Sequence, residues 1–129
     1  MSRKEISGEK KAFHQGSHGK RERYVQPSIL MVLYLNPSYG YELIQNIRKF
    51  GFMEGQAPPG MIYRHLRQLE EEGLVSSEWK TEGAGPARRV YQLAPDGKEM
   101  LAMWIEFMDR QAKNLNKFIA QYRKTQRKT

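Results

Sequence analysis

Side chains with several hydrogen-bond donors recur on one face of a predicted helix, residues 58–72. Ile62, Leu66 and Leu69 follow the helical spacing i, i+4, i+7 and define an inward face. The opposite face carries small, basic and amide residues: Gly60, Met61, Arg64, Arg67 and Gln68. Arginine bonds guanine through two N–H groups and glutamine bonds adenine, so this face is a candidate reader of base edges. An ordinary solvated helix face has the same residue types, and the helix alone leaves that interpretation open.

A second basic group surrounds a predicted turn. Gly83 to Pro86 cannot continue a strand, which predicts a hairpin with strands over residues 74–81 and 88–93. The strand ends that flank the turn carry Lys80, Arg88 and Arg89. Basic side chains at a slim hairpin tip suit the phosphate backbone or the minor groove. Solvated strand ends also carry charge often, so the hairpin strengthens the case for DNA without deciding it.

Three helices precede the hairpin in the predicted order. The first spans residues 27–36 and ends there because a residue before proline resists helical angles. The second begins with Ser38 as its cap and ends near Phe50. The third covers residues 58–72 and stops at Gly73. The order helix, helix, helix, hairpin predicts a mainly α winged helix-turn-helix with a small β-hairpin.

The last predicted element is a helix over residues 96–124 with a heptad pattern. Two lines of positions, each with a spacing of seven and offset by three, are apolar except at Gln111, which is the pattern of a coiled-coil seam. The seam consists of Leu101, Trp104, Met108, Gln111, Leu115, Phe118 and Tyr122. A lone helix exposing this stripe needs a partner surface, and twofold homodimers are the commonest soluble oligomers. We therefore expect dimerisation through this helix; folding back onto its own domain is the alternative.

Charge is concentrated at the two ends of the chain. Of the net charge of +8, residues 1–24 contribute +4, residues 25–96 contribute −1 and residues 97–129 contribute +5. A basic end can neutralise phosphates or act as a solubilising tail. The expected organisation is a flexible basic arm over residues 1–24, a winged domain over 25–95, a dimerisation helix over 96–124 and a basic tail over 125–129.

Several classes of protein are disfavoured by the composition. The chain has no cysteine, which excludes a disulfide framework and a thiolate metal site. No apolar run approaches the roughly 20 residues that span a bilayer, and the N-terminus lacks a signal peptide, so we expect a cytoplasmic protein without a membrane partner. His14 and His18 have no third ligand nearby, so no metal or other cofactor is expected. His65 is expected to touch a phosphate or to be solvated. No nucleophile has an evident base, so the chain is not expected to be an enzyme.

Spaced motifs occur in an order typical of one known family. Gly40-Tyr41-Glu42-Leu43 is the first motif, and Ile62-Tyr63-Arg64 leading into Leu66 is the second. Residues 69–74 (Leu-Glu-Glu-Glu-Gly-Leu) and 85–91 (Gly-Pro-Ala-Arg-Arg-Val-Tyr) follow, with Leu93 and Gly97 after them. Across about residues 25–97 the chain resembles the PadR family of bacterial transcriptional regulators. The resemblance implies a winged helix-turn-helix repressor that dimerises through a C-terminal helix.

The resemblance also implies roles for single residues. Tyr41, Tyr63 and Arg64 are expected to contact operator DNA, with the hairpin arginines on the DNA backbone. Tyrosine suits a phosphate contact because its hydroxyl donates a hydrogen bond without adding charge. The arm over residues 1–24 extends beyond the usual start of the family, and the loop over residues 50–59 is long. No role is carried over to either segment.

A small aromatic or hydrophobic effector is a further partner that the resemblance implies. The single C-terminal helix is similar to the short subfamily, which includes phenolic-acid and multidrug-responsive repressors. In some of its members aromatic drugs bind in a groove at the dimer interface. The candidate lining here is Met103, Trp104, Phe107 and Met108, with Tyr34 or Met31 nearby. Their alternative role is packed interface core.

The predicted function is that of a homodimeric repressor. Two recognition helices are expected to enter successive major grooves of a pseudo-palindromic operator. Two alternatives stay open. One is a winged-helix module that binds a protein partner, and the other is an architectural protein whose basic ends bind DNA without sequence preference.

Overall fold

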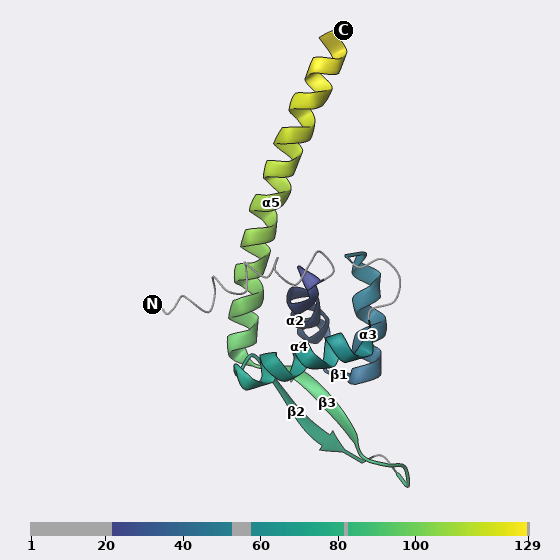
Figure 1. Ribbon diagram of the computed structural model, residues 1–129. Coiled ribbons are helices and arrows are strands. Elements are labelled where there is room, and N and C mark those ends of the chain that lie inside the picture. The colour runs from purple at the N-terminus through teal and green to yellow at the C-terminus, as the bar shows by residue number, and fades with distance from the viewer. Residues whose placement is uncertain (1–21, 53–57, 82, 129) are drawn as a thin grey trace.

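The computed structural model describes residues 22–52, 58–81 and 83–128, and confirms the predicted fold class. Its elements in chain order are α2 (Val25–Leu35), β1 (Ser38–Tyr39), α3 (Gly40–Ile47), the 3₁₀ turn η3 (Arg48–Phe50), α4 (Pro59–Glu71), β2 (Val75–Lys80), β3 (Arg88–Leu93) and α5 (Pro95–Lys128). The hairpin β2–β3 is the wing. Its tip and the far end of α5 extend from opposite ends of the molecule (Figure 1). Most of the predicted arm over residues 1–24, including His14 and His18, lies outside the described residues.

The three helices pack around one apolar core. α4 turns Ile62, Leu66 and Leu69 inward, as their spacing predicts, and all three side chains are buried. They meet buried side chains of α2 and α3: Ile29, Leu30, Leu43 and Ile47. Helix α4 begins at Pro59, in the first turn, where a helix needs no hydrogen bond from the backbone N–H that proline lacks. Just after its end, Gly73 has a φ of 78°, the left-handed conformation that often terminates a helix. The prediction of the inward face of the third helix is therefore correct, and the opposite face of this helix is exposed.

The sheet has three antiparallel strands in the order β1-β3-β2. The wing pairs Lys80 with Arg88 at its outer end and Val75 with Leu93 at its base. β1 was not predicted from the sequence, and it changes the role of Ser38. That residue pairs with Tyr91, and its Oγ donates to the carbonyl of Asn36 at 3.0 Å. The prediction that Ser38 caps the second helix is wrong because this residue belongs to a strand.

Helix α3 is capped one residue later than predicted. Its N-cap residue is Tyr39, whose backbone N–H donates to Oε1 of Glu42 at 2.8 Å. This bond satisfies one of the backbone donors at the start of the helix. Tyr41, in the first turn of this helix, is exposed and lies beside Arg88 at the outer end of the wing.

Helix α5 has two distinct parts. Its first turns pack against α2, and Leu101 and Trp104 are buried there, with only 2% of Trp104 exposed. The later turns project away from the domain (Figure 1), and Phe118 is 77% exposed. Leu101 and Trp104 were predicted for the seam between copies, but both side chains pack inside their own domain, as the fold-back alternative describes. The helix also continues to Lys128, so the predicted basic tail over 125–129 is helical as far as it is described.

Among the described residues, no helix combines the length and the apolar character that crossing a membrane requires. The same residues contain no group of three histidine, aspartate or glutamate side chains arranged to hold a metal ion.

Candidate nucleic-acid interface

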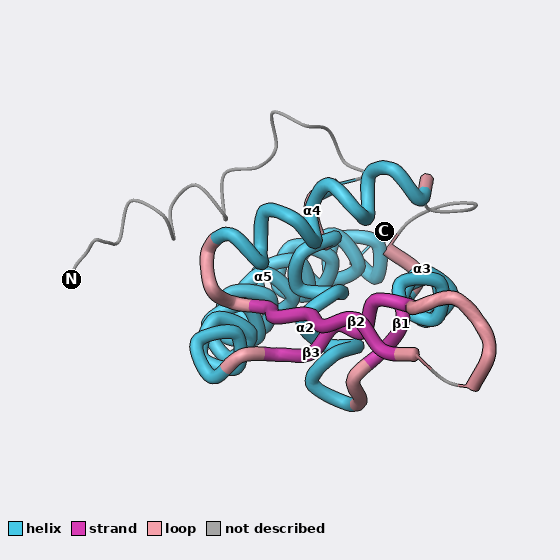
Figure 2. Tube along the Cα trace, turned by 90° about the horizontal axis from the view of Figure 1, so that it is seen from below, coloured by secondary structure: helices cyan, strands magenta, loops and turns pink. Residues whose placement is uncertain are grey.

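The exposed face of α4 lies beside the wing. Figure 2 shows α4 along one side of the sheet, with α3 next to β1. The outward residues predicted on α4 are exposed or, for Met61, half-buried: Gly60, Met61, Arg64, Arg67 and Gln68. Tyr63, which the family resemblance assigns to DNA, is also exposed. The exposed face therefore adjoins the wing without any element of the described chain covering it.

A shallow basin of about 390 Å³ separates α3 and α4 from the wing. It is lined by Tyr39, Gly40, Tyr41, Tyr63, Trp79, Arg88, Arg89 and Tyr91. Four predicted site residues meet here, Tyr41 and Tyr63 with the two wing arginines. Arg64, Arg67, Gln68 and Lys80 lie outside the basin's lining. We call this surface the tyrosine–arginine basin.

Aromatic rings support the arginines of the basin. The Arg88 guanidinium lies 5.9 Å from the ring centre of Tyr41, which stacks on Tyr39 at 6.0 Å and 5°. The Arg89 guanidinium lies 5.6 Å from the ring centre of Trp79. Guanidinium groups and phenol hydroxyls are both hydrogen-bond donors, so the basin suits an anion such as a phosphate. Tyr39 and Trp79 were not predicted, although the wing register places Trp79 directly opposite Arg89.

Close packing between α3 and α4 sets the position of Tyr63. A Cβ atom added to Gly40 would lie 2.8 Å from Cε1 of the Tyr63 ring, and closer still to its hydroxyl oxygen. Glycine at this position therefore permits the ring to lie across the start of α3. This contact gives a physical reason for glycine in the motif Gly40-Tyr41-Glu42-Leu43.

Gly40→Ala is expected to lower the free energy of unfolding by about 1–3 kcal/mol, because the added methyl group must displace the Tyr63 ring. Urea denaturation measures this change. Gly60→Ala is the matched control, since nothing lies within 4 Å of a Cβ at Gly60 and alanine favours a helix. Equal stability of the two variants would contradict the packing role of Gly40.

Arg89 joins the wing to the last turns of α4. Its Nε donates to Oγ of Ser77 at 2.8 Å, and Ser77 Oγ donates to Oε2 of Glu70 at 2.6 Å. The Arg89 guanidinium also lies 3.5 Å from Oε1 of Glu70. Glu70 thus holds the wing against α4, a role that its place in a run of three glutamates does not indicate. A contact of Arg89 with the DNA backbone stays a prediction.

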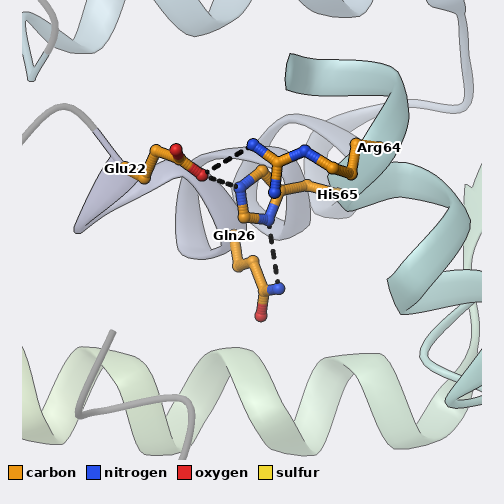
Figure 3. A network of polar contacts seen from close by, with 4 residues as sticks. All are labelled: Glu22, Gln26, Arg64 and His65. Atoms are coloured by element: carbon orange, nitrogen blue, oxygen red, sulfur yellow. Dashed lines mark hydrogen bonds and ion pairs between the residues drawn. The ribbon is translucent and has the colours of Figure 1, made fainter. Parts of the chain in front are cut away.

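Near the start of α2, one carboxylate binds two consecutive residues of α4 (Figure 3). Oε1 of Glu22 lies 3.0 Å from Nη2 of Arg64 and 2.8 Å from Nε2 of His65. His65 Nδ1 lies 3.2 Å from Nε2 of Gln26 on α2. An amide nitrogen only donates, so Nδ1 accepts and Nε2 carries the proton that it donates to Glu22.

This network corrects the expectation for His65. The side chain is buried, with 3% of the residue exposed, so it neither touches a phosphate nor is solvated. Burial raises the pKa of the Glu22 carboxyl, but the hydrogen bonds from His65 and Arg64, together with the positive charge of Arg64, outweigh it and lower the pKa overall. Glu22 is therefore a charged acceptor at neutral pH. Sequence reasoning missed it because the partners lie 42 and 43 residues away.

Of the four residues predicted to line an effector groove, Trp104 is buried within its own chain, and Met103, Phe107 and Met108 are half-buried. Trp104 packs edge-on against Phe107 at 5.9 Å and against Tyr24 at 6.4 Å. An apolar cavity of about 120 Å³ lies nearby, lined by Pro27, Ser28, Met31, Phe50, Phe52, Leu101, Ile105 and Met108. Of the predicted groove residues, Met108 and the neighbouring Met31 line this cavity, and Trp104 does not.

Relatives of this chain are transcriptional regulators. The transcriptional regulator Rv3488 of Mycobacterium tuberculosis is 36% identical over 66 residues, 51% of this chain and 58% of that protein. The chain thus aligns with somewhat more than half the length of this curated relative. A solved PadR family transcription regulator from Clostridium difficile is 27% identical, with a TM-score of 0.66 over 74% of this chain and 98% of that chain.

One similar structure contains DNA. Bacillus subtilis PadR, solved in complex with operator DNA, is 24% identical with a TM-score of 0.57, over 65% of this chain and 48% of that chain. At this identity the likeness shows a shared fold. The model of the Transcriptional regulator PadR-like family matches residues 29–103, which include α4, the wing and the start of α5. The family match also agrees with the prediction that the chain is not an enzyme. This chain belongs to the PadR-like family of transcriptional regulators.

Proposed function

We propose that this protein is a sequence-specific DNA-binding repressor that acts as a homodimer. The observation that carries the proposal is the exposed face of α4 next to the tyrosine–arginine basin. The operator DNA in the Bacillus subtilis PadR structure supports the same kind of ligand. A repressor of this kind acts on DNA in the cytoplasm.

Recognition divides between the helix and the basin. Arg64, Arg67 and Gln68 on the exposed face of α4 reach base edges in the major groove, where arginine and glutamine have matching partners. Gly60 at the start of α4 leaves room for the duplex to approach, and Met61 follows it on the same face. The donors of the basin, led by Tyr41 and Tyr63, bind the phosphates that flank this groove. Arg88, Arg89 and Lys80 of the wing bind the backbone further along.

The later turns of α5 provide the surface for a second copy. Leu115, Phe118 and Tyr122 are exposed and share one face of the helix, together with Gln111. Leu101 and Trp104 pack within their own domain, so the seam between the copies starts near Met108. Two copies joined in this way place two α4 helices on one duplex, which favours a palindromic site.

A small aromatic effector releases the repressor from DNA in this proposal. Met103, Phe107 and Met108 are half-buried beside the start of the seam, and Met108 also lines the apolar cavity next to α2. Flat rings and flexible methionine side chains adapt to apolar ligands. A ligand bound there lies between α2 and α5 and can change the angle at which α5 leaves the domain.

Arg64→Ala tests the reading role of α4. On the duplex that the protein prefers, we expect a loss of about 1–3 kcal/mol in binding and relaxed preference at one base pair. Fluorescence anisotropy with duplexes substituted one base pair at a time measures both. Arg110→Ala, an exposed arginine on α5, is the matched control and leaves the preference unchanged. An unaltered preference in Arg64→Ala would overturn the proposed role of this side chain.

A further inference from the structure

We propose that Glu22 is a positioning residue for DNA recognition, which holds the Arg64 guanidinium in the orientation that reads a guanine. This inference rests on the proposed function, in which Arg64 contacts a base. It concerns a residue that precedes the segment matched by the family model, residues 29–103.

The Glu22 carboxylate is held by two consecutive residues of α4. Its Oε1 binds both Arg64 and His65, and His65 in turn binds Gln26 of α2. An isolated ion pair on a surface restrains its arginine weakly, because two long side chains must be ordered for one contact. Here the carboxylate is only 16% exposed and also accepts a hydrogen bond from a buried imidazole, so its position is defined by α2 and α4 together.

Arg64 keeps free donors while it is held. A guanidinium has five N–H groups in one plane, and Nη2 of Arg64 uses one of them on Glu22. About half of the side chain, 49%, is exposed, so a ligand can reach it, and O6 and N7 of guanine can accept two parallel hydrogen bonds from an arginine. An arginine already ordered in this orientation loses less conformational freedom when it binds a base.

The Glu22 carboxylate also weakens the attraction of Arg64 to phosphates at non-specific sites. Paired with Glu22, Arg64 contributes less net charge to its surroundings, so it attracts phosphates at random positions less strongly. A guanine offers two directed acceptors and still competes well for the free donors. Glu22 therefore raises the ratio of specific to non-specific binding.

The test uses Glu22→Ala and Glu22→Gln in the full chain, each with and without Arg64→Ala. The duplexes are the preferred site and the same site changed at the base pair on which Arg64 acts. We expect Glu22→Ala to reduce discrimination at that base pair by about threefold to tenfold, the loss of one pre-ordered side chain. Glu22→Gln keeps an acceptor oxygen for His65 and is expected to have a smaller effect. In the Arg64→Ala background, Glu22→Ala is expected to cause no further loss of discrimination.

The outcomes separate this inference from the function on which it rests. If Arg64→Ala relaxes the preference at one base pair but Glu22→Ala leaves discrimination intact, Glu22 is not a positioning residue. This conclusion holds even if Glu22→Ala changes the affinity for all duplexes equally. Such a change would come from lower protein stability, or from an Arg64 that no longer pairs with a carboxylate. If neither variant changes any base preference, both the inference and the reading role of Arg64 are wrong. The unfolding free energy of each variant is measured in parallel, and Glu22→Gln replaces Glu22→Ala as the deciding variant if Glu22→Ala does not fold.

Discussion

Phe118→Glu is expected to convert the proposed dimer into monomers and to weaken binding to a palindromic duplex by at least about a hundredfold. The side chain is 77% exposed in a single chain, so the substitution leaves the domain's own core unchanged. In the proposed seam it places an unpaired charge at a buried apolar position, which costs about 3–5 kcal/mol. Sedimentation velocity measures the oligomeric state, and anisotropy with the preferred duplex measures the binding.

Ala120→Glu is the control for Phe118→Glu. It adds the same charge to the same exposed part of α5, two residues further along and on the face away from the seam. We expect it to remain dimeric and to bind DNA as the unaltered protein does. A Phe118→Glu variant that stays dimeric would show that the copies do not meet along this stripe.

Gly97→Ala is expected to lower the free energy of unfolding by about 3 kcal/mol, at the upper end of the usual cost of overpacking. A Cβ at Gly97 would collide with the carbonyl oxygen of Leu74 and lie 2.5 Å from Cδ1 of Leu93. The Leu74 carbonyl is backbone and accepts a hydrogen bond from the N–H of Ala94 at 3.0 Å, so it cannot rotate away. The start of α5 must therefore move off the base of the wing.

Urea denaturation of Gly97→Ala measures this loss. Lys98→Ala, at the next residue and exposed, is the matched control and is expected to be near neutral. Stability of Gly97→Ala equal to that of the control would mean that α5 does not depend on this contact.

The helices and the wing were predictable because their signals are local. The spacing of Ile62, Leu66 and Leu69 depends only on the helical period, and their burial follows from it. The second wing strand, Arg88–Leu93, is bounded by a turn and matches the prediction. β1 was not predictable in this way, since a strand of two residues has no period and depends on its pairing with Tyr91.

The heptad pattern of α5 was predictable from the sequence. The surface against which each position of the pattern packs was not. Leu101 and Trp104 belong to the same repeat as Leu115 and Phe118. An apolar stripe packs equally well against a helix of its own domain or against a second copy. Only the position of α2 decides that the first two are buried within the chain.

The polar contacts of the site were the least predictable part. Arg64, Arg88 and Arg89 could be chosen by residue type and by their place on an expected helix or wing. Their acidic partners could not, because Glu22 is distant in sequence and Glu70 carries no local signal. Such pairings depend on tertiary structure, and they determine which donors of each arginine are left for DNA.

Selection from a pool of random duplexes at about 150 mM salt is the most direct test of sequence-specific binding by two copies. At this salt concentration the non-specific attraction between protein and phosphates is weakened, so specific contacts decide which duplexes are bound. The purified full chain is mixed with the pool and the bound fraction is sequenced. We predict an enriched palindrome whose half-sites lie about 10 base pairs apart, centre to centre. Binding without any enriched sequence would contradict the proposed function and would leave a protein that holds DNA by charge alone.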